Sequence, residues 1–283
     1  MTDEQPPNVR IVVSSRPENV AIVREVLAGL ADSIEIDTIE DVKVAVSEAC
    51  NNVVVHAYDE RGGPLEVEVF VGRHELDVVV RDHGVGIGPR PVDDDFPGHG
   101  IGLAVIEALA SRTEMRAHAG QGIEMAMRFD LPEQPDFGGA DAGPAIAAPE
   151  GPTEMLEVVV APARLASGIF VRVMGALGVR AGFSIDRLAD AQLVADALAA
   201  HLEPALAEPH VRLGVAASER RLDLWVEPLR LGGSAGLVAD SAIGDLGPII
   251  ERLVDEVEIH PDVSSEALAL SMWERRPARS SAA

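Results

Sequence analysis

Residues 39–58 read IEDVKVAVSEACNNVVVHAY. Apolar residues recur at three- and four-residue intervals from Ile39 to Val53, the spacing that lines one face of an α-helix. Glu48 and Asn52 are four residues apart, so their side chains share a helical face. The stretch therefore predicts a long amphipathic helix that carries a carboxylate and a carboxamide one turn apart.

The elements around this helix predict a two-layer α+β sandwich, with helices on one face of a mixed sheet. Strands are predicted from apolar runs and alternating patterns, and helices from three- and four-residue spacing. In chain order the segments are RIVVSS (10–15), ENVAIVREVLAGL (18–30), the helix above, PLEVEVFVG (64–72), HELDVVVRD (74–82), IGLAVIEALASR (101–112), TEMRAHAG (113–120) and GIEMAMRFD (122–130). Together they define a first domain over residues 9–132.

The composition excludes several classes of partner. The chain has 283 residues with 23 basic and 47 acidic side chains, and its formal net charge of -24 would repel phosphate backbones and anionic lipids. We therefore expect no direct binding to nucleic acid or membrane. A single cysteine, Cys50, and the absence of a long apolar stretch favour a cytoplasmic protein. Cys50 itself is interpreted as a small packed residue of the helix.

The second half of the chain resembles the first. Residues 133–152 are rich in Pro, Gly, Ala and acidic residues and predict a linker, so that a second domain spans residues 153–276. Residues 36–53 align without a gap to residues 185–202, and Val12 matches Val159 in the preceding strand. The chain is therefore predicted to be a tandem duplication of one fold.

Two glycine-containing motifs follow the long helix of the first half. Asp82-His83-Gly84-Val85-Gly86 comes directly after a strand, where a carboxylate can accept a hydrogen bond from the exocyclic amine of adenine. Gly98-His99-Gly100-Ile101-Gly102-Leu103 opens a helix, and backbone amides at such a position are natural donors to phosphate oxygens. Each motif alone is often only a turn, but with Glu48 and Asn52 they predict an ATP site. His99 is interpreted either as a phosphate contact or as a loop histidine without a role.

These three motifs, in this order, resemble the nucleotide-binding motifs of the gyrase, chaperone and histidine-kinase (GHKL) ATPase superfamily. Over residues 9–132 the chain is most similar to anti-sigma factor serine/threonine kinases. The resemblance implies that Asn52 binds Mg²⁺ and that Glu48 is the catalytic base. It also implies ATP as phosphate donor, with Asp82, Gly84, Gly86, Gly98, His99, Gly100, Ile101, Gly102 and Leu103 around it.

The resemblance further implies protein partners. The substrate would be an anti-sigma factor antagonist of the STAS type, and whether a sigma factor also binds stays open. Two other interpretations remain: an ATP-gated binding module without catalysis, and the detached ATPase domain of a histidine-kinase-like system.

The second copy lacks the candidate site residues. Ala197 aligns with Glu48, His201 with Asn52 and Pro228 with Asp82, so we expect no ATP binding there. We hypothesise that this copy replaces the second subunit of a dimer, forming an intramolecular pseudo-dimer; the alternative is an independent domain on a loose tether.

Overall fold

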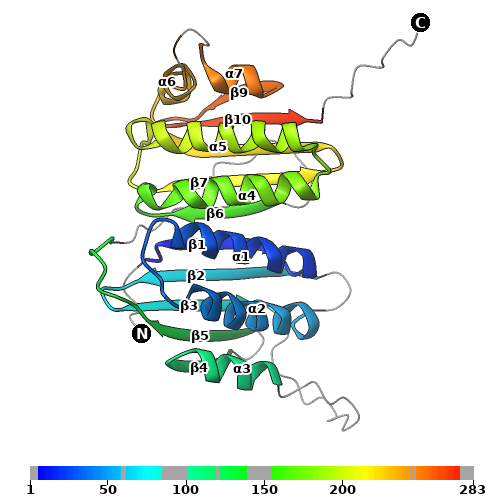
Figure 1. The fold of residues 1–283 in the computed structure, drawn as a ribbon, viewed down its shortest axis with the longest axis vertical. Coiled ribbons are helices and arrows are strands. Elements are labelled where there is room, and N and C mark those ends of the chain that lie inside the picture. Colours follow the sequence, from blue (N-terminus) through cyan, green and yellow to red (C-terminus); the bar gives the residue numbers. More distant parts are fainter. Residues whose placement is uncertain are drawn as a thin grey trace, which may run out of the picture.

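A computed structural model describes residues 6–58, 62–84, 101–118, 122–138, 155–242, 244 and 247–274. Ten strands form one continuous sheet in the order β4-β5-β3-β2-β1-β6-β7-β8-β10-β9 (Figure 1). The strands are β1 (Val9–Ser14), β2 (Pro64–Val71), β3 (Glu75–Asp82), β4 (Arg112–His118), β5 (Gly122–Asp130), β6 (Met155–Val160), β7 (Val211–Ser218), β8 (Arg221–Leu229), β9 (Glu256–Pro261) and β10 (Glu266–Trp273).

The helices lie on one face of this sheet, as the sequence predicted (Figure 1). They are α1 (Pro17–Ala31), α2 (Ile39–His56), α3 (Ile101–Leu109), α4 (Ala166–Arg180), α5 (Ile185–Ala205), α6 (Gly233–Asp240) and α7 (Ile249–Leu253), with a 3₁₀ turn, η1 (Ala163–Leu165), before α4. Within the described residues, no helix combines the length and apolarity needed to cross a membrane.

The sheet is antiparallel rather than mixed, so that part of the prediction was wrong. All the strand pairs of the described residues run in opposite directions. The reason is the number of helices between adjacent strands. A single helix between two strands carries the chain back to the start of the first strand, so that the second strand runs parallel to it. Here two helices, α1 and α2, separate β1 from β2, and the second helix brings the chain back to the end of β1. Strand β2 therefore starts beside the end of β1 and runs antiparallel to it.

The two halves repeat the same arrangement. Outward from the centre, the first half has the strand order β1-β2-β3-β5-β4 and the second half β6-β7-β8-β10-β9. In each half the first strand is followed by two helices and then by two adjacent antiparallel strands. The halves meet at β1 and β6, where Ile11 pairs with Val158. This common topology supports the proposed duplication.

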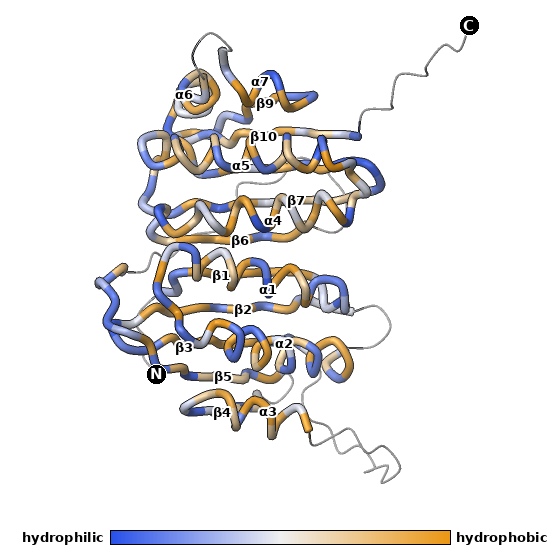
Figure 2. The backbone as a smooth tube through the Cα atoms, viewed as in Figure 1, coloured by the Kyte–Doolittle hydropathy of each residue, from blue (hydrophilic) through white to orange (hydrophobic). Residues whose placement is uncertain are grey.

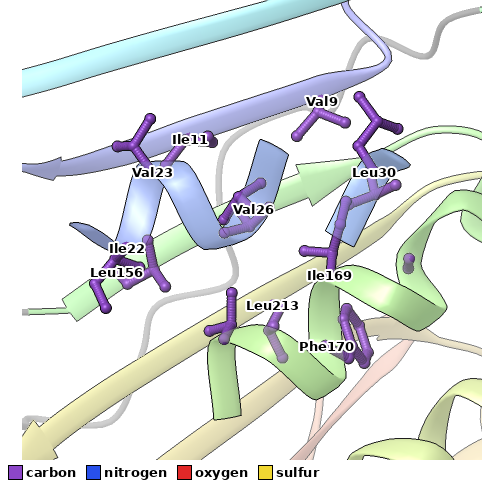
Figure 3. Close-up of a cluster of buried hydrophobic side chains, with 14 of the residues drawn as sticks. Val9, Ile11, Ile22, Val23, Val26, Leu30, Leu156, Ile169, Phe170 and Leu213 are labelled. Atoms are coloured by element: carbon purple, nitrogen blue, oxygen red, sulfur yellow. The ribbon is translucent and has the colours of Figure 1, made fainter. Parts of the chain in front are cut away.

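One hydrophobic core runs through both halves. Strand and helix residues from the two sides of the β1–β6 pair belong to a single buried cluster, and their side chains meet between α1, α4 and the sheet (Figure 3). Along the helices, apolar and polar residues alternate in the way expected when one face packs on the sheet (Figure 2). Because the cluster is continuous, the second half is not an independent domain on a loose tether.

The opposite face of the sheet carries ion pairs instead of helices. Arg81 bridges Glu68 and Glu124 at 2.5 and 2.8 Å, and Arg128 binds Asp77 at 2.6 Å. These residues alternate along their strands with the core residues, so the pattern reflects the two-residue period of a β-strand.

Residues 133–138, assigned to the linker by sequence, lie against the folded body. The Gln134 side chain is buried and donates to the Glu35 carbonyl at 2.9 Å. Arg164, just before α4, stacks 5.2 Å from the centre of the Phe137 ring. The rest of the predicted linker lies outside the described residues.

Asn8 joins the segments at the junction of the halves. Its side chain is 1% exposed, accepts a hydrogen bond from the Val71 amide at 2.7 Å, and donates to the carbonyls of Ala161 and Gly138. We expect Asn8→Ala to lower the free energy of unfolding by about 3 kcal/mol, because it leaves buried backbone groups without partners. Chemical denaturation measures this, with exposed Asn51→Ala as the control; equal stabilities of the two variants would contradict the assignment.

Cys50 is buried in α2 and is a packed residue, as interpreted from the sequence. Burial raises the pKa of its thiol from 9.0 to about 12. Since the thiolate is the reactive form, alkylation at pH 8 should be about a thousandfold slower in the folded than in the unfolded chain. Mass spectrometry after iodoacetamide treatment with and without urea tests this; similar rates in both states would show that Cys50 is accessible.

Candidate functional site

Helix α2 holds Glu48 and Asn52 on the side away from the core. Val46, Ala49 and Val53 are buried against the sheet and neighbouring helices, whereas Glu48 is half-buried and Asn52 is exposed. The apolar stripe therefore fixes the rotation of the helix and, with it, the direction of both polar side chains.

Helix α3 approaches these two side chains through Gly102. A Cβ atom placed on Gly102 would lie 3.1 Å from Oε2 of Glu48 and 3.8 Å from Oδ1 of Asn52. A larger residue would press on the carboxylate, so glycine keeps the space beside it free. The first and third sequence motifs thus meet at one point between α2 and α3.

Asp82 lies at the end of β3 with its carboxylate held by backbone amides. The residue is 4% exposed; Oδ1 accepts a hydrogen bond from the Gly84 amide at 2.8 Å and Oδ2 from the Ile123 amide at 3.2 Å. Each carboxylate oxygen has a second lone pair. The side chain is therefore fixed in position and can still accept a hydrogen bond from a ligand.

Two glycines allow the backbone to pack around Asp82. A Cβ on Gly84 would lie 2.8 Å from the carbonyl carbon of Ala57, at the end of α2. Gly122 has a φ of +92°, and its Cβ would lie 2.6 Å from the Asp82 carbonyl carbon. Both positions exclude other residues. The second motif is thereby packed directly against the helix that carries the first.

Tyr58 is a positioning residue to which the sequence analysis assigned no role. Its hydroxyl donates to the Pro64 carbonyl and accepts from the His83 amide, both at 2.6 Å. Burial raises the pKa of this hydroxyl, which keeps it protonated. Tyr58 thus ties the end of α2 to the residue that follows Asp82. Both of its partners are backbone atoms, which carry no residue-specific signal in the sequence.

The remaining predicted residues divide into two groups. Ile101 and Leu103 lie at the start of α3 and are 64% and 38% exposed. Both side chains are therefore accessible to a ligand. Gly86, Gly98, His99 and Gly100 lie outside the described residues.

The described residues fit a nucleotide whose phosphates supply metal ligands in addition to those of the protein. Among them, no three His, Cys, Asp or Glu side chains gather closely enough to hold a metal ion. Asn52 offers one exposed carboxamide oxygen, and Mg²⁺ commonly takes only one or two protein ligands and completes its octahedron with phosphates and waters. The free space at Gly102 adjoins that carboxamide.

The second half has a different arrangement at the corresponding place. Helix α6 follows β8 and buries Leu237 and Val238. Its start is held by the buried carboxylate of Glu266, which accepts from the amides of Ser234 at 2.7 Å and Gly232 at 3.1 Å. Although burial alone would raise the pKa of Glu266, these bonds hold it below its usual range.

The fold and the converging motifs agree with a family comparison. Residues 13–129 match the model of the histidine kinase-like ATPase domain. The first half of the chain is therefore a histidine-kinase-like ATPase module. A solved histidine kinase domain, from the blue-light-activated kinase of Erythrobacter litoralis EL346, is 25% identical, covers 34% of this chain and 45% of that one, and has a TM-score of 0.27.

Relatives of known name define the family more closely. The serine-protein kinase RsbW of Halalkalibacterium halodurans is 33% identical in an alignment of 140 positions that covers 44% of this chain and 85% of the relative. The same-named kinase of Bacillus thuringiensis is 32% identical in an alignment of 132 positions that covers 41% of this chain and 82% of the relative. The chain belongs to the family of these RsbW serine-protein kinases, with a second half beyond the matched length.

Proposed function

We propose that the chain is an ATP-dependent serine/threonine protein kinase that phosphorylates an anti-sigma factor antagonist of the STAS type in the cytoplasm and thereby regulates a sigma factor. The observation that carries the proposal is the meeting of Glu48, Asn52 and Gly102 between α2 and α3. Kinship with serine-protein kinases supports the same chemistry.

In this proposal the reaction is an in-line phosphoryl transfer. The acceptor hydroxyl oxygen bonds to the γ-phosphorus of ATP as the bond from that phosphorus to the β–γ bridging oxygen breaks, and ADP leaves. Glu48 orients the hydroxyl and accepts its proton. Asn52 would hold Mg²⁺, which neutralises charge on the triphosphate when bound. Asp82 accepts from the adenine amine, and the glycines around α3 let backbone amides approach the phosphates.

The second half has a structural role in this proposal. Because Pro228 replaces Asp82 and α6 is anchored through Glu266, it binds no ATP. Instead it packs on β1 and α1 as the second subunit of a dimer would, which makes the chain a pseudo-dimer. Sedimentation should then give a monomer; a stable homodimer would count against this role.

A transfer assay tests the kinase. The full chain is incubated with γ-labelled ATP, Mg²⁺ and candidate STAS domains, alongside Asn52→Ala. The matched control is His201→Ala, the aligned position of the second half. We expect acid-stable label on a serine or threonine of the antagonist, lost in Asn52→Ala and unchanged in His201→Ala. Nucleotide binding without transfer would favour the ATP-gated binding module, and acid-labile label on a histidine would favour a histidine-kinase-like system.

A further inference from the structure

The contact between the halves has a register with internal two-fold symmetry. We call the paired strands β1 and β6, together with the packed helices α1 and α4, the seam. The alignment that matches Val12 with Val159 also matches Ile11 with Val158, and these two residues pair with each other across the seam. An approximate two-fold axis therefore passes through this pair. A second copy of the first half, placed by that axis, would occupy the position of the second half.

The same alignment holds in the helices. Carried on without a gap, it matches five residues of α1 with five of α4, and all ten are buried. The residues are Ile22, Val23, Val26, Leu27 and Leu30 in α1, and Ile169, Phe170, Val173, Met174 and Leu177 in α4. Positions on the two helices can therefore be compared one by one.

The close approach of the helices depends on a glycine that α1 lacks at the matching position. A Cβ on Gly168 would collide with the Gly29 carbonyl oxygen and lie 2.8 Å from Cβ of Asp32. A Cβ on Gly29 would lie 2.5 Å from Cα of Ile169. The residue of α1 that matches Gly168 is Ala21. A second α1 in the place of α4 would bring a methyl group against the Gly29 backbone.

The two helices of the seam also carry charges of opposite sign where they face each other. Helix α1 and its C-terminal end present Glu18, Glu25 and Asp32, at intervals of seven residues. Helix α4 presents Arg172 and Arg180.

These arginines face the three acids. Arg172 binds both oxygens of Asp32, at 2.7 and 3.1 Å, and lies 3.7 Å from Glu25. Arg180 lies 3.6 Å from Glu18. The hydrogen bond from Arg172, more than its charge, lowers the pKa of Asp32.

A second copy of α1 would reverse the sign of these contacts. The residue of α1 that matches Arg172 is Glu25, so two Glu25 side chains would face each other, with Asp32 of each copy nearby. Each ion pair is partly exposed and individually weak. Repulsion of like charges would nevertheless add to the steric conflict at Ala21, and both disfavour the same arrangement.

From these two features we infer that the α1–β1 surface is specific for the chain's own second half and rejects another copy of the first half. The partner it fits is a helix with glycine at the crossing point and arginines facing Glu25 and Glu18. The inference rests on the proposed pseudo-dimer but not on the proposed kinase activity. It means that the protein works as a closed single-chain unit and does not pair its first halves.

The test separates the halves after the whole chain has folded. A protease recognition sequence is placed within residues 139–154, the purified chain is cut, and native mass spectrometry with sedimentation identifies the species. We expect a one-to-one complex of first and second halves. Release of both halves as monomers would overturn the pseudo-dimer and the inference together. Homodimers of the first half would overturn the inference alone.

Charge and size variants sharpen the test. Arg172→Glu with Arg180→Glu should weaken the one-to-one complex about tenfold or more, and adding Glu18→Arg, Glu25→Arg and Asp32→Arg should restore it. Ala21→Gly with Glu25→Arg should instead allow homodimers of the first half after cutting. Arg220→Glu, outside the seam, is the control. If the charge reversals leave the complex unchanged and Ala21→Gly with Glu25→Arg yields no homodimer, the inference fails.

Discussion

Replacing Glu48 with glutamine is expected to lower the rate of phosphoryl transfer by about 100- to 10,000-fold, the range in which a general base contributes. Glutamine has nearly the same shape and keeps the contact space beside Gly102, but it cannot take the proton of the acceptor hydroxyl. ATP affinity should change little. Single-turnover transfer at saturating ATP separates the two quantities.

The control for Glu48→Gln lies on the same helix. Glu40 is in the first turn of α2 and pairs with Lys43 at 2.7 Å, away from Gly102. Glu40→Gln should therefore transfer phosphate at the wild-type rate. A wild-type rate in Glu48→Gln as well would mean that the carboxylate does not act as a base, and that positioning and charge neutralisation account for the reaction.

Replacing Asp82 with asparagine should weaken ATP binding by about 10- to 100-fold, which corresponds to the loss of one hydrogen bond to a charged acceptor. In the folded chain its two oxygens accept from the amides of Gly84 and Ile123. The asparagine side chain accepts only through its oxygen, because its nitrogen is a donor. It therefore cannot accept from both backbone N–H groups and also from adenine. Calorimetric titration with ATP measures the change.

A nucleotide analogue makes the Asp82 prediction specific. Inosine triphosphate lacks the exocyclic amine, so the wild type should prefer ATP and Asp82→Asn should lose that preference. Asp77→Asn is the matched control, since Asp77 is on the same strand but binds Arg128 on the helix-free face. If wild type and Asp82→Asn discriminate equally between the two nucleotides, Asp82 does not contact the base.

Much of the secondary structure was predictable from the sequence. Helix α2 was expected from Ile39 and ends at His56 in the structure, because its apolar residues recur with the helical period over many turns. Strands β2 and β3 were equally clear from their alternation. The direction of the strands was not, since it depends on how many helices return the chain between them.

The candidate site was predictable only in part. The common face of Glu48 and Asn52 follows from their spacing in one helix. Their closeness to Gly102 does not, because it depends on the packing of α3 on α2. Tyr58 and Gly122 were missed for a related reason. Both act on backbone atoms near Asp82, and a backbone atom leaves no residue-specific mark in a sequence.

The sequence by itself determined where the helices lie and which residues form the three motifs, because period and spacing are properties of consecutive residues. Only the tertiary structure decided that the halves join in one sheet through β1 and β6. Strand edges pair through amides and carbonyls that nearly every residue carries, so their partners cannot be identified from side chains. The opposed charges of α1 and α4 and the fit of Gly168 on Gly29 became visible once that pairing had brought the two helices together.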